Sequence, residues 1–403
     1  MTTLSVIIPA YNEEGGIAAI VRRVLATGPA LQDVGVHSVE LIVVDDGSAD
    51  ETAAVAAEIP GVRLIRHPGN RGYGAALKTG FGAASGDLLC FLDADGTYPP
   101  EHLPQLCTSA LNGAELVIGS RMAGAASEMP WTRRLGNFFF ARLLSMVGRQ
   151  TVTDSASGMR VFRREILHRI YPLPDGLNLT PVMSTRAIHE GVRMVEVPIP
   201  YSERVGRSKL SVVRDGSVFL HSILWTALTY NPVRILGLLG LSGIGVSLLI
   251  GMGLVVARLQ GVTALDPWGV AAVFTALVGA VTGTSLFALG ITFNYLVSLF
   301  YKKPVRQGLF NWNLPGQPLE RHFGWAGLLA FLLGTALGLT SLALGISGWP
   351  MTRLWLYLLA GALLTLTGVQ LVIYWVLIRV LAELSQRDLM VSEEMLQYEA
   401  QQD

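Results

Sequence analysis

Four long stretches without a charged residue occupy the C-terminal part of this 403-residue chain. An α-helix rises about 1.5 Å per residue, so about 20 residues cross the roughly 30 Å hydrocarbon core of a bilayer. Each stretch is longer than that, and four fully buried core helices in succession would be exceptional in a soluble protein. The sequence therefore predicts four transmembrane helices, over residues 235–257, 269–300, 325–349 and 354–378.

The Lys and Arg residues of the connecting loops predict how these helices are oriented. The connection between the second and third helices holds four of them, whereas each of the other two connections contributes a single Arg. Loops rich in Lys and Arg remain in the cytoplasm. The N-terminus also lacks the basic segment and the cleavage site of a signal peptide. We therefore expect a multi-pass protein of the plasma (inner) membrane, with both termini in the cytoplasm.

The rest of the chain divides into an acidic part and a basic part. Residues 1–120 hold 6 Lys and Arg against 14 Asp and Glu, and residues 121–234 hold 16 against 8. The overall net charge is zero and 51% of the residues are hydrophobic, which argues against a disordered chain and against a nucleic-acid partner. Cys90 and Cys107 are not spaced as a metal-binding pair, so we expect buried free thiols.

The first 230 residues alternate between short apolar runs and helical stretches rich in Ala, Glu and Arg. Continuous apolar strands that alternate with helices are typical of a parallel sheet covered on both faces. The predicted strands are Leu4–Ala10, Val39–Asp46, Val62–His67, Asp87–Asp95 and Ala114–Gly119. We therefore expect an α/β domain over residues 1–230, an all-α transmembrane domain over residues 231–380, and a polar cytoplasmic tail over residues 381–403 that begins as a helix and frays into disorder.

Polar residues follow three of these strands, at Pro9–Glu14, Asp45–Ser48 and Asp93–Tyr98. In parallel sheets, ligands bind outside the carboxyl ends of the strands. Asp93 and Asp95 place two carboxylates one residue apart, and Mg²⁺ or Mn²⁺ prefers carboxylate, water and phosphate oxygens. Each motif alone could be an Asx turn that ends a strand. Two such motifs at one sheet edge favour a ligand site.

Taken in order, the strings DDGSADET, NRGYGAALKTG, FLDADGTYPPE, IGSR, SGMRVFRRE and RVGRSKL resemble the family-2 glycosyltransferases. The branch they resemble most comprises dolichol-phosphate mannose synthases and bacterial polyprenyl-phosphate glycosyltransferases. The resemblance covers residues 4–235 and the number and position of the membrane helices. It implies a GT-A (Rossmann-like, mainly parallel) fold, a divalent Mg²⁺ or Mn²⁺ ion, and inverting transfer from a UDP- or GDP-hexose to undecaprenyl or dolichyl phosphate.

The same resemblance implies roles for individual residues. The nucleotide would be bound by Pro9, Tyr11, Glu13, Asp45, Asp46, Asp93, Ala94 and Asp95. Asp93 and Asp95 would hold the metal and would act in catalysis together with Arg121. The acceptor phosphate would be bound by Arg121, Arg133 or Arg134, Arg204 and Lys209. Thr97 stands where the mannose synthases usually have a Gln that contacts the metal.

The chemistry of such a transfer is consistent with these residue types. A carboxylate-held divalent ion neutralises the leaving diphosphate as a Lewis acid. A polyprenyl phosphate is already an anion at neutral pH, so it needs positioning by Arg and Lys rather than a strong general base.

Two stretches, residues 131–149 and 212–230, combine apolar, aromatic and basic residues just before the membrane segments. Helices of this composition can lie at a membrane surface. The first stretch lacks a clean apolar face, so burial against the α/β domain is the alternative.

Two other functions compete with this interpretation. A processive membrane polysaccharide synthase would carry a QxxRW motif, which this chain lacks. A non-enzymatic transporter or scaffold with a nucleotide-binding domain would place ionisable residues inside its spans. The four predicted spans contain none, although they could mediate homo-oligomerisation.

Overall fold

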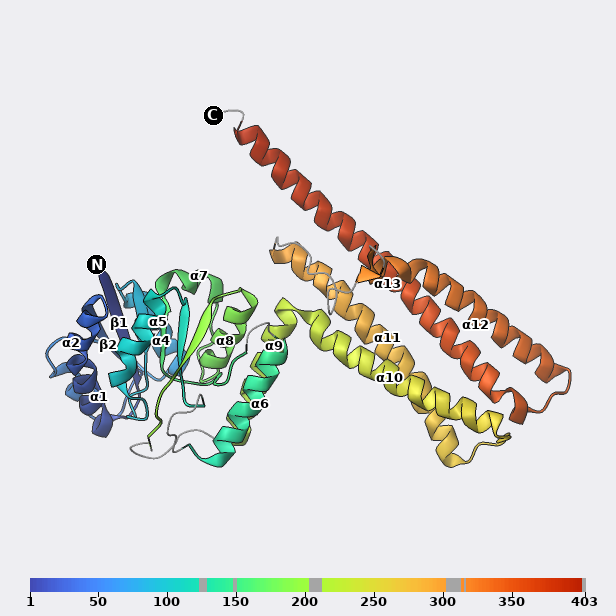
Figure 1. Ribbon diagram of the computed structural model, residues 1–403, viewed down its shortest axis with the longest axis horizontal. Coiled ribbons are helices and arrows are strands. Elements are labelled where there is room, and N and C mark those ends of the chain that lie inside the picture. Colours follow the sequence, from blue (N-terminus) through green and yellow to red (C-terminus); the bar gives the residue numbers. More distant parts are fainter. Residues whose placement is uncertain (123–128, 148–150, 203–211, 302–312, 315–316, 401–403) are drawn as a thin grey trace. The chain divides into compact units, whose positions relative to one another are not determined.

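The computed structural model describes residues 1–122, 129–147, 151–202, 212–301, 313–314 and 317–400. The chain divides into two compact units, Met1–Ala227 and Leu228–Asp403, whose elements are labelled in Figure 1.

The first unit is built on one seven-stranded sheet with the strand order β3-β2-β1-β4-β6-β5-β7. Strand β6 runs antiparallel to β4 and β5, and the other neighbouring pairs are parallel. The strands are β1 Thr2–Ala10, β2 Val36–Asp45, β3 Val62–Arg66, β4 Leu88–Phe91, β5 Leu116–Ser120, β6 Arg160–Arg163 and β7 Met194–Pro198. The predicted α/β domain with a mainly parallel sheet is therefore confirmed. The sheet also contains two strands that the sequence did not predict, β6 and β7.

Helices cover both faces of this sheet (Figure 1). The α-helices are α1 Glu14–Ala26, α2 Gly28–Asp33, α3 Thr52–Ala57, α4 Tyr73–Ala83, α5 Leu103–Leu111, α6 Trp131–Val147, α7 Leu167–Ile170, α8 Leu179–His189 and α9 Val212–Tyr230, and the 3₁₀ helices are η1 Pro100–His102 and η2 Arg164–Ile166. Successive strand residues point to opposite faces, so Val6 packs with α1 and α5 while Ile7 packs with α4 and α8. Because hydrophobic side chains and helices cover both faces of the sheet, a ligand can reach the sheet at the ends of its strands.

The carboxyl ends of the central strands lie at the same edge of the sheet. Ala10 at the end of β1 is paired with Asp45 at the end of β2, and Asp45 is paired with Arg66 at the end of β3. The turn after β2 packs closely against the segment that precedes α4, because a Cβ at Gly47 would lie 2.5 Å from the backbone of Gly69. The loops after β1, β2 and β3 therefore converge.

The second unit contains four helices that are long and apolar enough to cross a membrane, over Pro232–Leu259, Pro267–Val297, Phe323–Ile346 and Met351–Leu384. Each predicted span thus coincides with a helix that is able to cross a membrane, and the protein is a membrane protein. The complete elements are α10 Pro232–Leu259, α11 Pro267–Tyr301, β8 Asn313–Leu314, β9 Gln317–Pro318, η3 Leu319–His322, α12 Phe323–Ile346 and α13 Met351–Ala400. The last helix continues through most of the polar tail.

Glycines bring these helices together in two antiparallel pairs, α10 with α11 and α12 with α13 (Figure 1). A Cβ on Gly240 would lie 2.6 Å from the carbonyl oxygen of Gly283 in the neighbouring helix. A Cβ on Gly334 would lie 2.4 Å from the backbone nitrogen of Thr365. Small residues at such contacts allow the close backbone approach that stabilises helix pairs in lipid.

Candidate active site

A pocket with a volume of about 540 Å³ lies in the first unit, between the carboxyl ends of the central strands and helices α6, α8 and α9. A cavity of this size can hold a ligand of small-molecule dimensions. The predicted site residues that line it are Pro9, Tyr11, Glu13, Asp46, Asp93, Ala94, Asp95, Arg121 and Arg133. Sequence positions that are far apart therefore meet at one cavity.

The other four predicted site residues are placed differently. Arg134 is exposed on α6 and does not line the pocket, so of the two neighbouring arginines it is Arg133 that reaches the cavity. Asp45 is buried beneath the pocket rather than at its surface. Arg204 and Lys209 lie outside the described residues, and their predicted contact with the acceptor stays a prediction.

Asp45 ends β2 with its side chain completely buried. Its Oδ1 accepts a hydrogen bond of 3.2 Å from the backbone nitrogen of Ser48. Its Oδ2 lies 3.5 Å from Nε of Arg66 and accepts no hydrogen bond from the described residues. A buried carboxylate oxygen without a hydrogen-bond donor is costly, so this atom has unused capacity to accept one.

Both carboxylate oxygens of Asp46 accept hydrogen bonds from other groups of the protein. Its Oδ1 accepts hydrogen bonds from Nδ1 of His67 at 2.7 Å and from the backbone nitrogen of Arg71 at 2.9 Å. Its Oδ2 accepts one from the backbone nitrogen of Gly72 at 2.8 Å. Asp46 therefore lines the pocket mainly as the support of the loop that leads into α4.

The carboxylates of Asp93 and Asp95 are each oriented by a hydroxyl group. Oδ1 of Asp93 accepts a hydrogen bond of 2.8 Å from the hydroxyl of Tyr73. Oδ1 of Asp95 accepts hydrogen bonds from the hydroxyl of Thr97 at 2.6 Å and from its backbone nitrogen at 3.1 Å. Thr97 is buried, and in this chain it holds the carboxylate of Asp95 in place.

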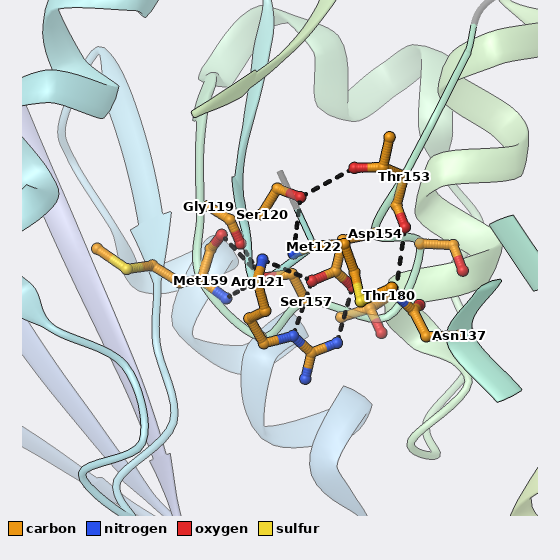
Figure 2. Close-up of polar contacts among 12 residues, drawn as sticks. Gly119, Ser120, Arg121, Met122, Asn137, Thr153, Asp154, Ser157, Met159 and Thr180 are labelled. Carbon is orange, nitrogen blue, oxygen red and sulfur yellow. Dashed lines mark hydrogen bonds and ion pairs between the residues drawn. The ribbon is translucent and has the colours of Figure 1, made fainter. Parts of the chain in front are cut away.

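Arg121 is held by Asp154, a residue that follows α6 and that the sequence did not single out (Figure 2). Nε and Nη2 of Arg121 each donate to the Asp154 carboxylate at 2.7 Å, and the backbone nitrogen of Arg121 donates to it at 3.0 Å. The guanidinium also lies over the rings of Tyr98 and Tyr201, at 5.8 and 5.4 Å from their centroids. Asp154 takes two of the three guanidinium nitrogens, so with respect to the residues that the structure describes, Nη1 is left to meet a ligand.

Arg121 and Asp154 each stabilise the charged form of the other. Burial is the largest single influence and by itself would lower the pKa of Arg121, but the charge and hydrogen bonds of Asp154 together with the nearby Tyr98 and Tyr201 outweigh burial and raise the pKa above its ordinary value. Burial alone would raise the pKa of Asp154, but the charge and hydrogen bonds of Arg121 lower it. Both groups are therefore charged at neutral pH, and the pair keeps a fixed geometry beside the pocket.

Residues 5–171 match the family model described as glycosyl transferase family 2, and residues 232–392 match a domain family of unknown function. A dolichyl-phosphate hexose transferase from Haloferax volcanii is 34% identical over 223 residues, which cover 55% of this chain and 92% of that protein. The chain belongs to glycosyltransferase family 2. The prediction of a glycosyltransferase with four membrane helices is thereby confirmed.

Two further similarities accompany this assignment. An undecaprenyl-phosphate 4-deoxy-4-formamido-L-arabinose transferase from Enterobacter sp. is 30% identical to this chain. The matched region covers 74% of this chain and 89% of the Enterobacter protein. The crystal structure of glucosyl-3-phosphoglycerate synthase from Mycobacterium tuberculosis with Mn²⁺, UDP and phosphoglyceric acid has a TM-score of 0.45 and 24% identity, covering 57% of this chain and 78% of that chain.

The glycosyltransferase offers two carboxylates, rather than a complete cage, to a divalent ion. Among the described residues, no group of three or more His, Cys, Asp and Glu side chains could hold a metal. Mg²⁺ in particular is usually held by one or two carboxylates together with water and substrate phosphates. Asp93 and Asp95, both at the pocket, fit an ion of this kind that shares its coordination with a diphosphate.

Arg160 is a buried cation that sequence analysis did not assign to the site. Its Nε and Nη2 donate to the carbonyl oxygens of Ser157 and Ser155, at 3.1 and 2.8 Å, and its Nη1 donates to the hydroxyl of Ser184 at 2.9 Å. Burial lowers the pKa of Arg160 to about 10, so the side chain is still protonated at neutral pH. Arg160 thus fixes the turn between Asp154 and β6.

Helices α6, α8 and α9 contribute lining residues that the sequence did not single out, among them Asn137 on α6, Thr180 on α8, and Asp215 and Phe219 on α9. Asn137 donates from Nδ2 to the carbonyl oxygen of Thr153 at 3.2 Å (Figure 2). Single polar residues inside helices have no spacing that marks them as functional. Only the folded arrangement of α6, α8 and α9 brings them to the cavity.

Proposed function

We propose that this glycosyltransferase transfers a hexose from a UDP- or GDP-hexose to a polyprenyl phosphate, undecaprenyl or dolichyl phosphate, at the cytoplasmic face of the plasma membrane. The observation that carries the proposal is one pocket that combines the carboxylates Asp93 and Asp95 with the cations Arg121 and Arg133, in a chain with four membrane-capable helices. The names of the two relatives, a dolichyl-phosphate and an undecaprenyl-phosphate transferase, support this class of acceptor.

The donor would occupy the side of the pocket formed by the ends of β1 and β2. Pro9, Tyr11 and Glu13 line the pocket and would contact the nucleoside, whereas Asp45 is buried and does not line the pocket, so it would reach the nucleoside only after the side chains around it move. A divalent Mg²⁺ or Mn²⁺ ion held by Asp93 and Asp95 would supply Lewis-acid stabilisation of the leaving diphosphate. Ala94, buried between the two carboxylates, would keep them at the required spacing.

The acceptor phosphate would bind on the opposite side. Nη1 of Arg121 and the side chain of Arg133 would contact its oxygens, and Arg204 and Lys209 would add charge from outside the described part of the chain. The phosphate attacks as an anion, so the protein contributes orientation and charge rather than proton abstraction. A single displacement on an α-linked donor inverts the anomeric centre and gives a β-linked product.

Helices α6 and α9 would rest at the membrane interface. On α6, Ala141 and Leu144 are buried, whereas Trp131 is 74% exposed and Phe138 is 59% exposed. On α9, Trp225 is 57% exposed. Exposed aromatic residues on helices that also line the pocket would place the acceptor-binding side near lipid headgroups. The buried face of α6 fits the alternative that this helix packs against the α/β domain, and contact of its exposed face with the membrane is part of the proposal.

Purified full-length protein, incubated with polyprenyl phosphate, Mn²⁺ and a panel of radiolabelled nucleotide sugars, tests the proposal. We expect label in the lipid phase with one donor, and loss of that label in Asp95→Asn. Asp33→Asn, which changes an exposed carboxylate on α2, is the matched control and should retain full transfer. Absence of lipid-linked label with every donor would refute the function, and undiminished transfer by Asp95→Asn would refute the role of Asp95.

A further inference from the structure

The loop before α4 is fixed at the pocket by the backbone. Asp46 accepts hydrogen bonds from the successive backbone nitrogens of Arg71 and Gly72. Gly72 has φ +102°, which L side chains rarely adopt, and a Cβ there would lie 2.6 Å from the carbonyl oxygen of Asp175. The loop therefore reaches α4 in a single defined conformation.

Asp46 is itself held from behind by His67, which follows β3. His67 is buried, its Nδ1 lies 2.7 Å from Oδ1 of Asp46, and its Nε2 lies 2.9 Å from the hydroxyl of Thr79 on α4. This chain of contacts ties the ends of β2 and β3 to the first turns of α4. Its effect is to define the position of the first residue of α4, Tyr73.

Tyr73 connects this fixed loop to Asp93, one of the two carboxylates that would hold the metal. Its hydroxyl donates to Oδ1 of Asp93 at 2.8 Å. A phenol has a proton to donate, and an ionised carboxylate can only accept hydrogen bonds. The hydrogen bond therefore has one possible direction, from the phenol to the carboxylate.

Asp93 is confined on its other side by Gly158. A Cβ at Gly158 would lie 2.5 Å from Oδ2 of Asp93, so the carboxylate packs directly against the backbone there. The backbone nitrogen of Gly158 is in turn fixed by a hydrogen bond of 2.7 Å to the hydroxyl of Tyr98. Two tyrosines thus define where the Asp93 carboxylate lies, one directly and one through the backbone.

The geometry points to Tyr73 as a positioning residue, whose hydroxyl holds the Asp93 carboxylate in the orientation needed to bind a divalent cation and the donor diphosphate. This inference rests on the proposed function, both for the identity of the donor and for the divalent ion that Asp93 and Asp95 would hold. Asp46 and His67 contribute to this positioning, because they fix the loop that leads into α4, whose first residue is Tyr73. The phenol does not contact the reacting atoms and acts only through Asp93.

The test is Tyr73→Phe in the full-length protein, which removes the hydroxyl and keeps the ring. Binding of Mn²⁺, alone and with UDP or GDP, is followed by electron paramagnetic resonance of the free ion. We expect the dissociation constant for Mn²⁺ to rise by about tenfold, which corresponds to about 1.4 kcal/mol and to one hydrogen bond to a charged group. The KM for the nucleotide sugar should rise with it, while the KM for polyprenyl phosphate should stay unchanged.

Tyr171→Phe is the matched control, because Tyr171 is 37% exposed and does not line the pocket, and it should bind Mn²⁺ like the wild type. Wild-type Mn²⁺ affinity and donor KM in Tyr73→Phe would overturn the inference, even if its thermal stability were lower. Wild-type protein that binds no Mn²⁺ under any of these conditions would overturn it as well. Failure of sugar transfer to polyprenyl phosphate would instead refute the proposed function, since the Mn²⁺ titration is independent of the acceptor.

Discussion

The buried ion pair of Arg121 and Asp154 tests how strongly burial increases the contribution of an ion pair to the free energy of unfolding. Asp154 has no exposed side-chain surface, and the side chain of Arg121 is 12% exposed. Arg23 and Glu101 form a pair of the same bidentate geometry, with hydrogen bonds of 2.9 and 2.8 Å, but their side chains are 41% and 54% exposed. The two pairs therefore differ mainly in their access to water.

Asp154→Asn removes the negative charge with little change in shape and leaves the Arg121 guanidinium buried without its counter-ion. Loss of one partner of a buried ion pair costs about 3–5 kcal/mol. For a unit of the size of Met1–Ala227, each kcal/mol corresponds to about 2–4 °C in melting temperature, so we expect a decrease of about 6 °C or more. Glu101→Gln should cost less than about 1 kcal/mol, because exposed pairs contribute little.

Thermal unfolding of both variants in the same detergent, at pH 7, provides the comparison. The lowered pKa of Asp154 gives a second signature. A carboxyl whose pKa is lower in the folded state contributes stability that is complete above its ordinary pKa of 3.8 and is lost as the pH falls through the lower folded value. Wild-type protein should therefore lose this contribution only in strong acid, and Asp154→Asn should lack it throughout. Equal losses in Asp154→Asn and Glu101→Gln would refute the argument from burial.

Three further predictions concern the metal and the membrane helices. Chelation by EDTA should abolish sugar transfer, and added Mn²⁺ or Mg²⁺ should restore it; activity that persists in EDTA would contradict a metal-dependent reaction. Thr97→Val keeps the shape of a buried side chain but removes its hydrogen bond to Asp95, so the Mn²⁺ concentration for half-maximal activity should rise about tenfold; an unchanged Mn²⁺ dependence would show that Thr97 does not orient Asp95. Gly240→Leu should lower the melting temperature of the membrane unit, because a Cβ there meets the backbone of Gly283, whereas Gly251→Leu, with open space around it, should not; equal effects would argue against close packing of α10 and α11.

Much of the fold follows from local patterns in the sequence. Strands β1, β2, β4 and β5 contain runs of buried apolar residues, and the membrane helices are long uncharged stretches, so hydrophobic patterning marks them directly. Strand β3 is only partly buried, but Val62, Leu64 and Ile65 still give it an apolar pattern. Strand β6 is four residues long and begins and ends with Arg160 and Arg163, so it has no such pattern. Strand β7 carries a Glu and ends in Pro198, and its residues are only partly buried. Both depend on tertiary pairing, which a single sequence does not display.

The candidate site shows the same division. Asp93 and Asp95 were predictable because their spacing at a strand end is itself a chemical signal. Asp154 was not, because a single Asp in a polar loop is indistinguishable from a turn residue until Arg121 is seen to bind it. Asp46 lines the pocket, but its hydrogen bonds to the distant residues Arg71 and Gly72 are not visible in the DDGS string.

The central claim is that one hexose is joined to the phosphate of a polyprenyl phosphate. Mass spectrometry of the lipid extracted after incubation with undecaprenyl phosphate and the active nucleotide sugar tests it most directly. We expect the lipid to gain a single hexose residue and to retain a single phosphate in the wild type, and to stay unmodified in Asp95→Asn. A lipid that gains a sugar phosphate, a sugar polymer in place of a glycosylated lipid, or an unmodified lipid would contradict it.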